Sequence, residues 1–280
     1  MSQTKIDYLV IGHITRDIAP EKPSGYKVGG TVTFSGRVAQ ALGCRTAVLT
    51  SARPDYNMSP ALDGVLTHVI PAEQDSIFDN IYQDNNRVQV LYGVAEKIKL
   101  ADLPQGWEHP AIVHLGPLTN EVDPQFIHAF PNSLIGITPQ GWMRRWGDDG
   151  RIYARSFPAE QMLLENAAAT VISEEDLLDD EMLDRYIAWS KILVMTQNYA
   201  GCTVFANGRT YQVPAPQIDL VEPTGAGDIF AAAFFVQLQR NGRDPIQAAE
   251  FANRVAAHSV TTPDLDKKVI AWQNQPFSTN

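Results

Sequence analysis

The stretch Glu222-Pro223-Thr224-Gly225-Ala226-Gly227-Asp228 leads directly into an apolar run from Ile229 to Leu238. The run has no proline or glycine before Gly242 and is rich in Ala, Phe and Leu, so it predicts a buried helix. The glycines then lie at the helix N-terminus, where the first backbone N–H groups have no partner inside the helix. Small residues allow close approach, and the helix dipole favours negative charge, so we expect an anion pocket there.

Asp228 lies in the first turn of this predicted helix. Its carboxylate would lie beside the bound anion, where it could take a proton from an attacking hydroxyl group. The simpler interpretation is a tight turn followed by an acidic residue that favours the start of a helix. We prefer the functional interpretation because the helix is too apolar for a surface-type start and a second glycine-rich stretch lies near the other end of the chain.

The composition limits the classes of function. The chain has 280 residues with 44% hydrophobic and 19% charged residues, which fits one large α/β domain with an ample core. A net charge of -10 argues against nucleic acid or an anionic membrane as a partner, since both favour basic surfaces. With no apolar segment of membrane-spanning length, no signal-like N-terminus and only Cys44 and Cys202, we expect a reduced cytoplasmic protein.

Strand-like and helix-like segments alternate along the chain, which predicts a mostly parallel sheet covered by helices. The expected strands are residues 6–12, 46–50, 111–115, 134–138, 170–173 and 192–196, with a hairpin of 203–206 and 210–213 around Asn207-Gly208. The expected helices are residues 32–42, 124–130, 158–166, 182–190, 229–240 and 245–260.

A second, smaller β element is expected outside this pattern. Residues 77–82 and 87–92 alternate polar and apolar side chains around Asp84-Asn85-Asn86, which is typical of a hairpin with one polar face. We assign this hairpin, together with part of residues 14–28, to a small β lid. An edge hairpin of the main sheet is the alternative.

Two motifs resemble the ribokinase (PfkB) family of carbohydrate and nucleoside kinases. The C-terminal motif is Thr224-Gly225-Ala226-Gly227-Asp228 with the apolar helix after it, followed by a later helix from Phe251 to Val260. The N-terminal motif places Gly29-Gly30 before Leu42-Gly43 and after Gly12-His13-Ile14-Thr15-Arg16-Asp17. The resemblance extends over about residues 6–262.

This resemblance implies a three-layer αβα, doubly wound, mostly parallel sheet. It implies one kinase domain over residues 1–280, with lid segments at about 14–28 and 76–93, which transfers the γ-phosphate of ATP to an alcohol. The expected acceptor is a small sugar, a polyol such as an inositol, or a nucleoside. Because lids of this family often pair, a homodimer through the lid is also expected, with no nucleic-acid or membrane partner.

The resemblance also implies roles for individual residues. Asp228 matches the catalytic base, and the amides of Gly225, Ala226 and Gly227 match the anion hole that neutralises the transferred phosphoryl group. The remaining matches concern binding: acceptor binding by Asp17, Gly29, Gly30 and Thr33, and nucleotide binding by Thr196, Gly201, Thr224, Asn253 and Arg144. For Asp17 and Asn253 a capping or turn role is the alternative. For Arg144 or Arg145 the alternative is a surface turn.

The chain departs from the family pattern at several positions. Phe34 stands where many relatives carry Asn, which predicts a more apolar acceptor pocket. The Mg²⁺-ordering Asn-x-x-Glu is represented only by 173–176, so Asp176 or Glu175 is expected to order the metal through water. Glu222 replaces an Asp near a monovalent-cation site, which leaves dependence on K⁺ open.

Two other classes of function compete with the kinase. The weakened metal motif, together with Asn198 in place of a usual glycine, allows a non-catalytic sensor that binds a sugar or a nucleotide. A nicotinamide-dependent dehydrogenase is set aside, because no Gly-x-Gly-x-x-Gly follows the first strand. The six histidines show no metal-ligand spacing on one element, which argues against a metal hydrolase.

Overall fold

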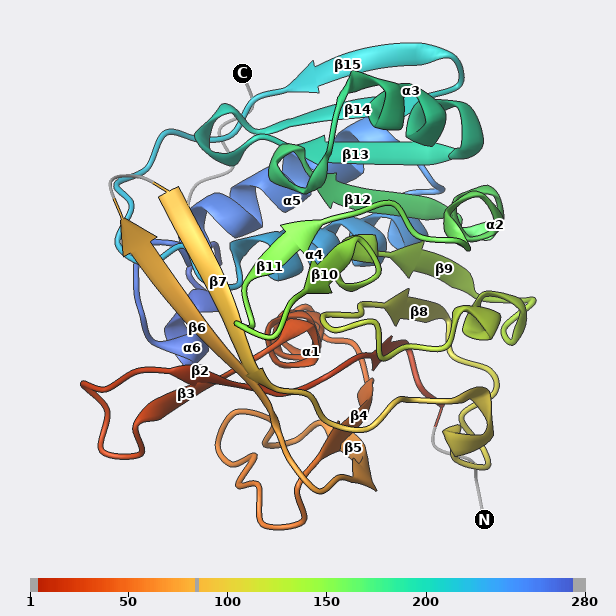
Figure 1. Ribbon diagram of the computed structural model, residues 1–280. Helices are drawn as coiled ribbons and strands as arrows, with labels where there is room; N and C mark the ends of the chain where they lie inside the picture. The colour runs from red at the N-terminus through yellow and green to blue at the C-terminus, as the bar shows by residue number, and fades with distance from the viewer. Residues whose placement is uncertain (1–4, 84–85, 274–280) are drawn as a thin grey trace.

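The computed structural model describes residues 5–83 and 86–273, and a nine-stranded sheet crosses its centre (Figure 1). In spatial order the strands are β15 (Arg209–Val213), β14 (Cys202–Ala206), β13 (Ile192–Thr196), β12 (Ala169–Ser173), β9 (Leu134–Ile137), β8 (Ile112–Leu115), β1 (Tyr8–Ile11), β4 (Thr46–Ala52) and β5 (Leu66–Pro71). All neighbouring pairs from β13 to β5 are parallel, whereas β14 is antiparallel to both of its neighbours. Such a sheet needs helices on both faces.

The central strands are apolar and buried along their whole length, which is why short hydrophobic runs identified them in the sequence. The predicted hairpin around Asn207-Gly208 is confirmed, and both turn residues have the positive φ that such a turn requires. Strand β5 was not predicted. It lies at the sheet edge, and half-exposed side chains such as Leu66 break the hydrophobic pattern there.

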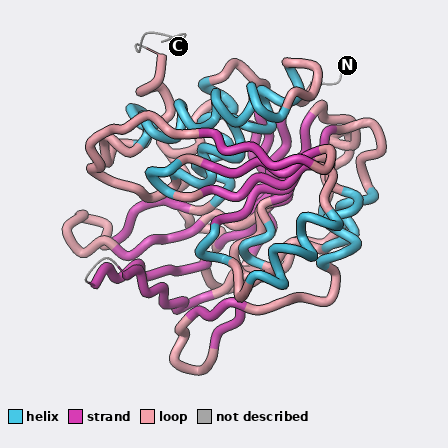
Figure 2. The backbone as a smooth tube through the Cα atoms, turned by 90° about the horizontal axis from the view of Figure 1, so that it is seen from above, coloured by secondary structure: helices cyan, strands magenta, loops and turns pink. Residues whose placement is uncertain are grey.

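Helices form a layer on each face of the sheet (Figure 2). One layer contains α1 (Thr31–Ala41), α4 (Ala226–Arg240) and α5 (Pro245–Ser259), and the other contains α2 (Glu160–Asn166) and α3 (Asp180–Trp189). This arrangement confirms the predicted three-layer fold. The predicted helix at 124–130 is wrong: Pro124–His128 is a 3₁₀ turn, η2, because Pro131 ends the segment before a longer helix can form.

Helix α4 is largely buried, and its apolar side chains fix it against the sheet. Phe234 and Phe235 are fully buried, and a Cβ at Gly136 of β9 would lie 2.5 Å from the Phe235 ring. A glycine in β9 therefore allows this helix to approach closely. Burial stabilises the fold by about 1.5–3 kcal/mol per large apolar side chain, so this packing holds the N-terminus of α4 in a defined place.

A separate four-stranded sheet, which we call the lid, has the order β3-β2-β6-β7. Its strands are β2 (Thr15–Ile18), β3 (Tyr26–Gly29), β6 (Ser76–Gln83) and β7 (Asn86–Gly93). Strand β2 joins the two hairpins by pairing in parallel with β6. The fold class with a separate small sheet is thus confirmed, and the alternative of an edge hairpin of the main sheet is excluded. Residues 84–85 of the predicted turn lie outside the described residues.

Buried polar contacts fasten the lid to the main sheet. The imidazole of His13 contacts Ser76 Oγ at 2.7 Å and the carbonyl oxygen of Glu96 at 2.8 Å. Arg16 of β2 forms an ion pair at 2.7 Å with Asp75, whose side chain is 3% exposed and also accepts the Arg53 N–H, directly after β4, at 2.8 Å. A short ribbon of β10 (Arg144–Trp146) and β11 (Ile152–Ala154) lies against the lid, since Leu91 N–H donates to the Gly150 carbonyl.

Within residues 5–83 and 86–273, no helix combines the length and apolar character needed to span a bilayer.

Candidate functional site

The predicted site residues gather at the edge of the sheet where the parallel strands end. Strands β12 and β13 end there at Ser173 and Thr196, and the chain leaves β1 there to form the lid. Strand β15 runs in the same direction, so the loop after Val213 also starts at this edge and leads to the first residue of α4. The lid lies along this edge, on the left of Figure 1. Ligands of open α/β sheets bind at this kind of edge.

The N-terminus of α4 is open on one side. Gly225 is the N-cap with φ 81°, a conformation that favours glycine. The Ala226 N–H donates to the Pro223 carbonyl at 3.0 Å, which engages one of the three predicted anion-hole amides within the turn itself. The amides of Gly225 and Gly227 have no hydrogen-bond acceptor among the described residues. A Cβ added to Gly227 would meet no atom within 4 Å, so open space lies beside that amide.

Helix α1 covers the other side of this N-terminus. A Cβ at Gly225 would overlap the ring of Phe34, which is 7% exposed. The next residue, Ser35, donates its hydroxyl to the carbonyl oxygen of Asp228 at 3.0 Å. Two consecutive residues of α1 therefore position the turn that carries Asp228, whose side chain is partly exposed. Phe34 was predicted to make the acceptor pocket apolar, and the structure places its ring against the glycine turn.

The four predicted acceptor-binding residues lie together at the junction of the lid and α1. The Asp17 carboxylate accepts a 2.7 Å hydrogen bond from Thr15 Oγ1 and lies so close to Gly29 that a Cβ there would overlap it. Gly30 is the N-cap of α1 with φ 90°, and Thr33 donates its hydroxyl to the Gly29 carbonyl at 2.7 Å. Because Thr33 directly precedes Phe34 and Ser35, this cluster adjoins the N-terminus of α4.

A polar turn precedes α4. Glu222 Oε1 accepts hydrogen bonds from the Thr224 N–H at 3.0 Å and the Thr224 hydroxyl at 2.6 Å. Glu222 Oε2 lies 3.6 Å from Nζ of Lys27, which belongs to lid strand β3. Burial acts to raise the pKa of Glu222, but the Thr224 hydrogen bonds and the charges of Lys27 and Lys268 outweigh it and lower this pKa. The lid is thus joined electrostatically to the turn before α4.

Lys268 contacts this turn, although no local sequence pattern indicates such a role. It closes the short helix α6 (Leu265–Lys268), in a stretch that reads as a solvated helix end. Its side chain is 2% exposed, and its ammonium donates to the carbonyl oxygens of Glu222 at 2.6 Å and of Thr224 at 3.2 Å. Burial lowers the pKa of Lys268 to about 8, against the opposing charge of Glu222.

Three of the predicted nucleotide-binding residues lie around the ends of β13 and β15. Thr196 ends β13, and its hydroxyl donates to the Ile172 carbonyl at 3.2 Å. Gly201 has φ 100° and packs on the backbone of Val213 and Pro214, so only glycine fits there. Asn253 of α5 is 4% exposed, and its amide donates to the Val213 carbonyl at 2.8 Å. Asn253 thus anchors the start of the loop that leads to α4.

The two predicted metal-ordering acids occupy different surroundings. The Asp176 carboxylate accepts hydrogen bonds from the Ser173 N–H at 3.1 Å and from Gln140 Nε2 at 2.9 Å, so both of its oxygens are engaged. Glu175 is exposed and accepts one bond, at 3.1 Å, from Asn198. No group of three or more His, Cys, Asp or Glu side chains arranged to hold a metal exists in the described part of the chain. Of the two acids, Glu175 is the one whose exposed carboxylate is open to the water ligands of a hydrated Mg²⁺.

Arg144 is tied to the lid. Its side chain is 6% exposed, and Nη2 donates to Gln89 Oε1 of β7 at 2.8 Å while Nη1 donates to the Leu118 carbonyl at 3.4 Å. Its guanidinium also lies over the ring of Phe78 at 6.0 Å. The alternative of an exposed surface turn does not hold for Arg144. Arg145, in contrast, is exposed beside Tyr153.

A buried polar pair lies beneath α4. His114 of β8 is fully buried and contacts the Tyr8 hydroxyl at 2.8 Å and the Thr138 hydroxyl at 2.9 Å. Its ring also lies edge-on to Phe235 of α4, with 5.1 Å between centroids. Burial lowers the pKa of His114 to about 3, so the imidazole is neutral at physiological pH.

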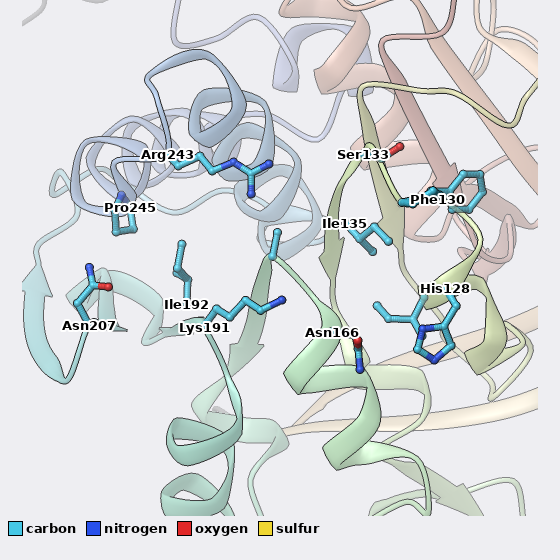
Figure 3. Close-up of a pocket in the computed structure, with 13 residues that line it drawn as sticks. His128, Phe130, Ser133, Ile135, Asn166, Lys191, Ile192, Asn207, Arg243 and Pro245 are labelled. Atoms are coloured by element: carbon cyan, nitrogen blue, oxygen red, sulfur yellow. The ribbon is translucent and has the colours of Figure 1, made fainter.

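A hollow of about 620 Å³ lies at the opposite edge of the sheet, around the segments that precede β9, β12 and β13. Figure 3 shows Lys191 and Arg243 extending into it from two different loops. None of the predicted site residues lines this hollow. The carboxyl edge is therefore where the predicted residues meet.

Comparison with known proteins fits this geometry. Residues 159–270, which include the α4 turn and Asn253, match the model of the pfkB family carbohydrate kinases. The cytidine kinase of Thermococcus kodakarensis is 23% identical over 252 residues, which cover 84% of this chain and 89% of that protein. These matches make the chain similar to PfkB-family kinases, which supports a phosphotransferase activity with an alcohol group as acceptor.

Solved structures show the same ribokinase-like fold. A pyrophosphate-dependent kinase of the ribokinase family, in complex with a pyrophosphate analogue and myo-inositol, aligns with a TM-score of 0.77 and 21% identity. That alignment covers 91% of this chain and 96% of the other. A fructokinase from Vibrio cholerae O395 with fructose, ADP and calcium aligns with a TM-score of 0.70 and 15% identity, over 94% and 96% of the two chains. A double mutant of that fructokinase contains fructose, ADP and potassium.

Proposed function

We propose that this PfkB-family enzyme transfers the terminal phosphoryl group of a phosphoanhydride donor to one hydroxyl group of a small polyol, sugar or nucleoside. The observation that carries the proposal is the N-terminus of α4. Two amides without an internal acceptor, those of Gly225 and Gly227, adjoin Asp228, and open space lies beside Gly227. The Asp17 cluster reaches the same place through α1.

In the proposed reaction the acceptor hydroxyl lies between Asp17 and Asp228. Asp228 takes the hydroxyl proton as the acceptor oxygen forms its bond to phosphorus. The bond between phosphorus and the bridging oxygen of the donor breaks at the same time, and the donor leaves as ADP or as inorganic phosphate. The Gly225 and Gly227 amides face the transferred phosphoryl oxygens, and the helix dipole adds favourable potential there.

Two donors are to be considered, ATP and pyrophosphate, and a different observation supports each of them. Thr196, Gly201, Thr224 and Asn253 surround the strand ends and the loop before α4, where a nucleotide of the ADP-bound fructokinase type would lie. Pyrophosphate is the second donor to test, because kinases with that donor share this fold at a TM-score of 0.77 or 0.78. A bound Mg²⁺ would supply charge neutralisation of the donor phosphates, with Glu175 and Asp176 holding its water ligands.

The acceptor classes to test follow from the relatives. Myo-inositol and fructose are bound in the two structures above, and the curated relative is named a cytidine kinase. The Asp17 carboxylate would accept hydrogen bonds from acceptor hydroxyl groups, and Gly29 leaves room for this. A homodimer through the lid stays a prediction, which sedimentation analysis of the purified protein tests.

The test is phosphoryl transfer by the wild-type protein and by Asp228→Asn. We would measure ADP release from ATP and phosphate release from pyrophosphate, each with myo-inositol, fructose and cytidine. Asp228→Asn is expected to lower kcat about a hundredfold or more, because the base is lost while the side-chain shape stays. Binding of ADP, measured by calorimetry, should change little.

Lys191→Gln, at the opposite edge of the sheet, is the matched control and should keep full turnover. Near-normal turnover of Asp228→Asn would overturn the role of this residue. No transfer by the wild-type protein with either donor, combined with clear binding of ADP or myo-inositol, would instead support the sensor alternative.

A further inference from the structure

The turn before α4 contains a charged group that the proposed reaction does not use. Lys268 is 2% exposed, and its ammonium contacts the carbonyl oxygens of Glu222 and Thr224 at 2.6 and 3.2 Å. A buried ammonium costs free energy unless it gains strong partners, so a lysine in this place requires an explanation. The lysine also comes from a distant part of the chain, 40 residues or more beyond the turn that it contacts.

The two carbonyls belong to Glu222 and Thr224, which lie three residues and one residue before Gly225. Between them, the Pro223 carbonyl accepts the Ala226 N–H, and Glu222 Oε1 accepts both polar groups of Thr224. The Lys268 ammonium thus binds two carbonyl oxygens, those of Glu222 and Thr224, which would otherwise repel each other across a tight turn. With those carbonyls held, the turn that carries the Gly225 and Gly227 amides is held as well.

The charge at this turn is balanced within the protein. The Glu222 carboxylate faces Lys27 of the lid at 3.6 Å, while its main-chain oxygen faces Lys268. A free alkali cation in the same place would have to compete with the covalently attached ammonium. In contrast, potassium is present in one structure of the Vibrio cholerae fructokinase.

We propose that Lys268 is a positioning residue whose ammonium serves as a built-in monovalent cation, ordering the turn that presents the Gly225 and Gly227 amides to the phosphoryl group. This inference rests on the proposed function. Lys268 is then the group that keeps the anion hole in shape, and the wild-type enzyme needs no added K⁺.

The test compares Lys268→Met and Lys268→Ala with the wild-type protein in KCl, NaCl or choline chloride at equal ionic strength. Wild-type kcat should be the same in the three salts. Lys268→Met should lower kcat about a hundredfold, because a catalytic turn that moves by about 1 Å loses that much, while KM for the acceptor stays within about threefold. The kcat of Lys268→Ala should rise at least tenfold when KCl or methylammonium chloride is present. Choline chloride should not raise it.

Lys267→Met is the matched control, since Lys267 is the exposed neighbour in the same helix. It should behave as the wild-type protein. Dependence of the wild-type enzyme on K⁺, or a Lys268→Met enzyme with kcat within twofold of wild type, would overturn the proposal. A loss in both Lys268 variants that no cation restores would also overturn it, because it would show a purely structural role.

A second measurement separates this inference from the proposed function. Amide hydrogen exchange over residues 222–228 needs no substrate. Exchange there should be at least tenfold faster in Lys268→Ala and should slow again in KCl, and unchanged exchange would overturn the inference. If the wild-type protein transfers no phosphoryl group but this exchange pattern holds, the proposed function fails while the role of Lys268 in ordering the turn stands.

Discussion

Gly227 and Gly225 show how two glycines in one motif serve different physical needs. At Gly225 the backbone has φ 81° and the Phe34 ring fills the side-chain space, so both conformation and packing require glycine. At Gly227 a Cβ would meet nothing within 4 Å. The requirement for glycine at 227 therefore does not come from the fold, and under the proposed function it comes from the phosphoryl group.

Because of this difference, we expect that replacing Gly227 by alanine does not reduce stability but does reduce activity. Gly227→Ala should keep or raise the free energy of unfolding, by up to about 1 kcal/mol, because alanine favours a helix more than glycine does. It should lower kcat at least tenfold, because the methyl group enters the space beside the amide. Urea denaturation and the phosphoryl-transfer assay measure the two effects.

Gly147→Ala, at an exposed loop glycine with no tight neighbour, is the control for the exchange of glycine for alanine. An active Gly227→Ala enzyme of unchanged kcat would show that the phosphoryl group does not approach this amide.

Among the elements, α5 is hydrogen-bonded to the end of β15, a contact that the sequence pattern alone does not predict. Asn253 of α5 was predicted to bind the nucleotide, and in the structure its amide donates to the carbonyl oxygens of Val213 and, at 3.4 Å, Pro214. The helix thereby fixes the point where the chain leaves the sheet and begins the loop to α4. Its effect on a donor nucleotide would pass through the backbone.

We expect Asn253→Ala to lower the free energy of unfolding by about 1–3 kcal/mol, because a buried carbonyl loses its donor. Asn253→Asp should be worse, because a buried carboxylate would face the same carbonyl oxygens. Both variants should raise KM for ATP more than KM for the acceptor. Asn241→Ala, which removes a half-buried asparagine at the far end of α4, is a comparison that should leave KM for ATP unchanged.

The elements also show which parts of the structure were predictable. Apolar runs identified the buried strands, and the helix predicted at 245–260 is confirmed as α5, where the Asp244 carboxylate caps Ile246 and Gln247. Strand β5 and the β10–β11 ribbon were missed because short, half-exposed strands have no strong period. Lys268 was missed because burial of a lysine depends on carbonyls more than forty residues away along the chain, which no local pattern reports.

For the whole molecule, the polar pair beneath α4 links global stability to pH. His114 has a pKa of about 3 in the folded protein, against about 6.5 for an unfolded chain. Below pH 6.5 the unfolded chain binds a proton that the folded protein does not. The free energy of unfolding therefore falls as the pH falls from 6.5 toward 3.

Through His114 alone, the free energy of unfolding should be about 2 kcal/mol lower at pH 5 than at pH 7. Urea denaturation of the wild-type protein and of His114→Gln at both pH values measures the effect, because glutamine keeps hydrogen-bonding groups but does not titrate. The variant should lose about 2 kcal/mol less than the wild type on acidification. His128→Gln, at an exposed histidine, should leave the pH dependence unchanged. An equal loss in wild type and His114→Gln would show that His114 titrates normally.

The lid is joined to the main sheet by four chain crossings: β1 to β2, β3 to α1, β5 to β6, and β7 to the segment before β8. A sheet held at both ends of each hairpin cannot swing away on a single hinge. If the lid opens, the backbone has to bend at all four crossings together, which limits the amplitude of the opening. The crossing from β3 to α1 passes through Gly29-Gly30 and continues into the helix that covers Gly225. Under the proposed function, release of product and exposure of the phosphate site would therefore be mechanically inseparable.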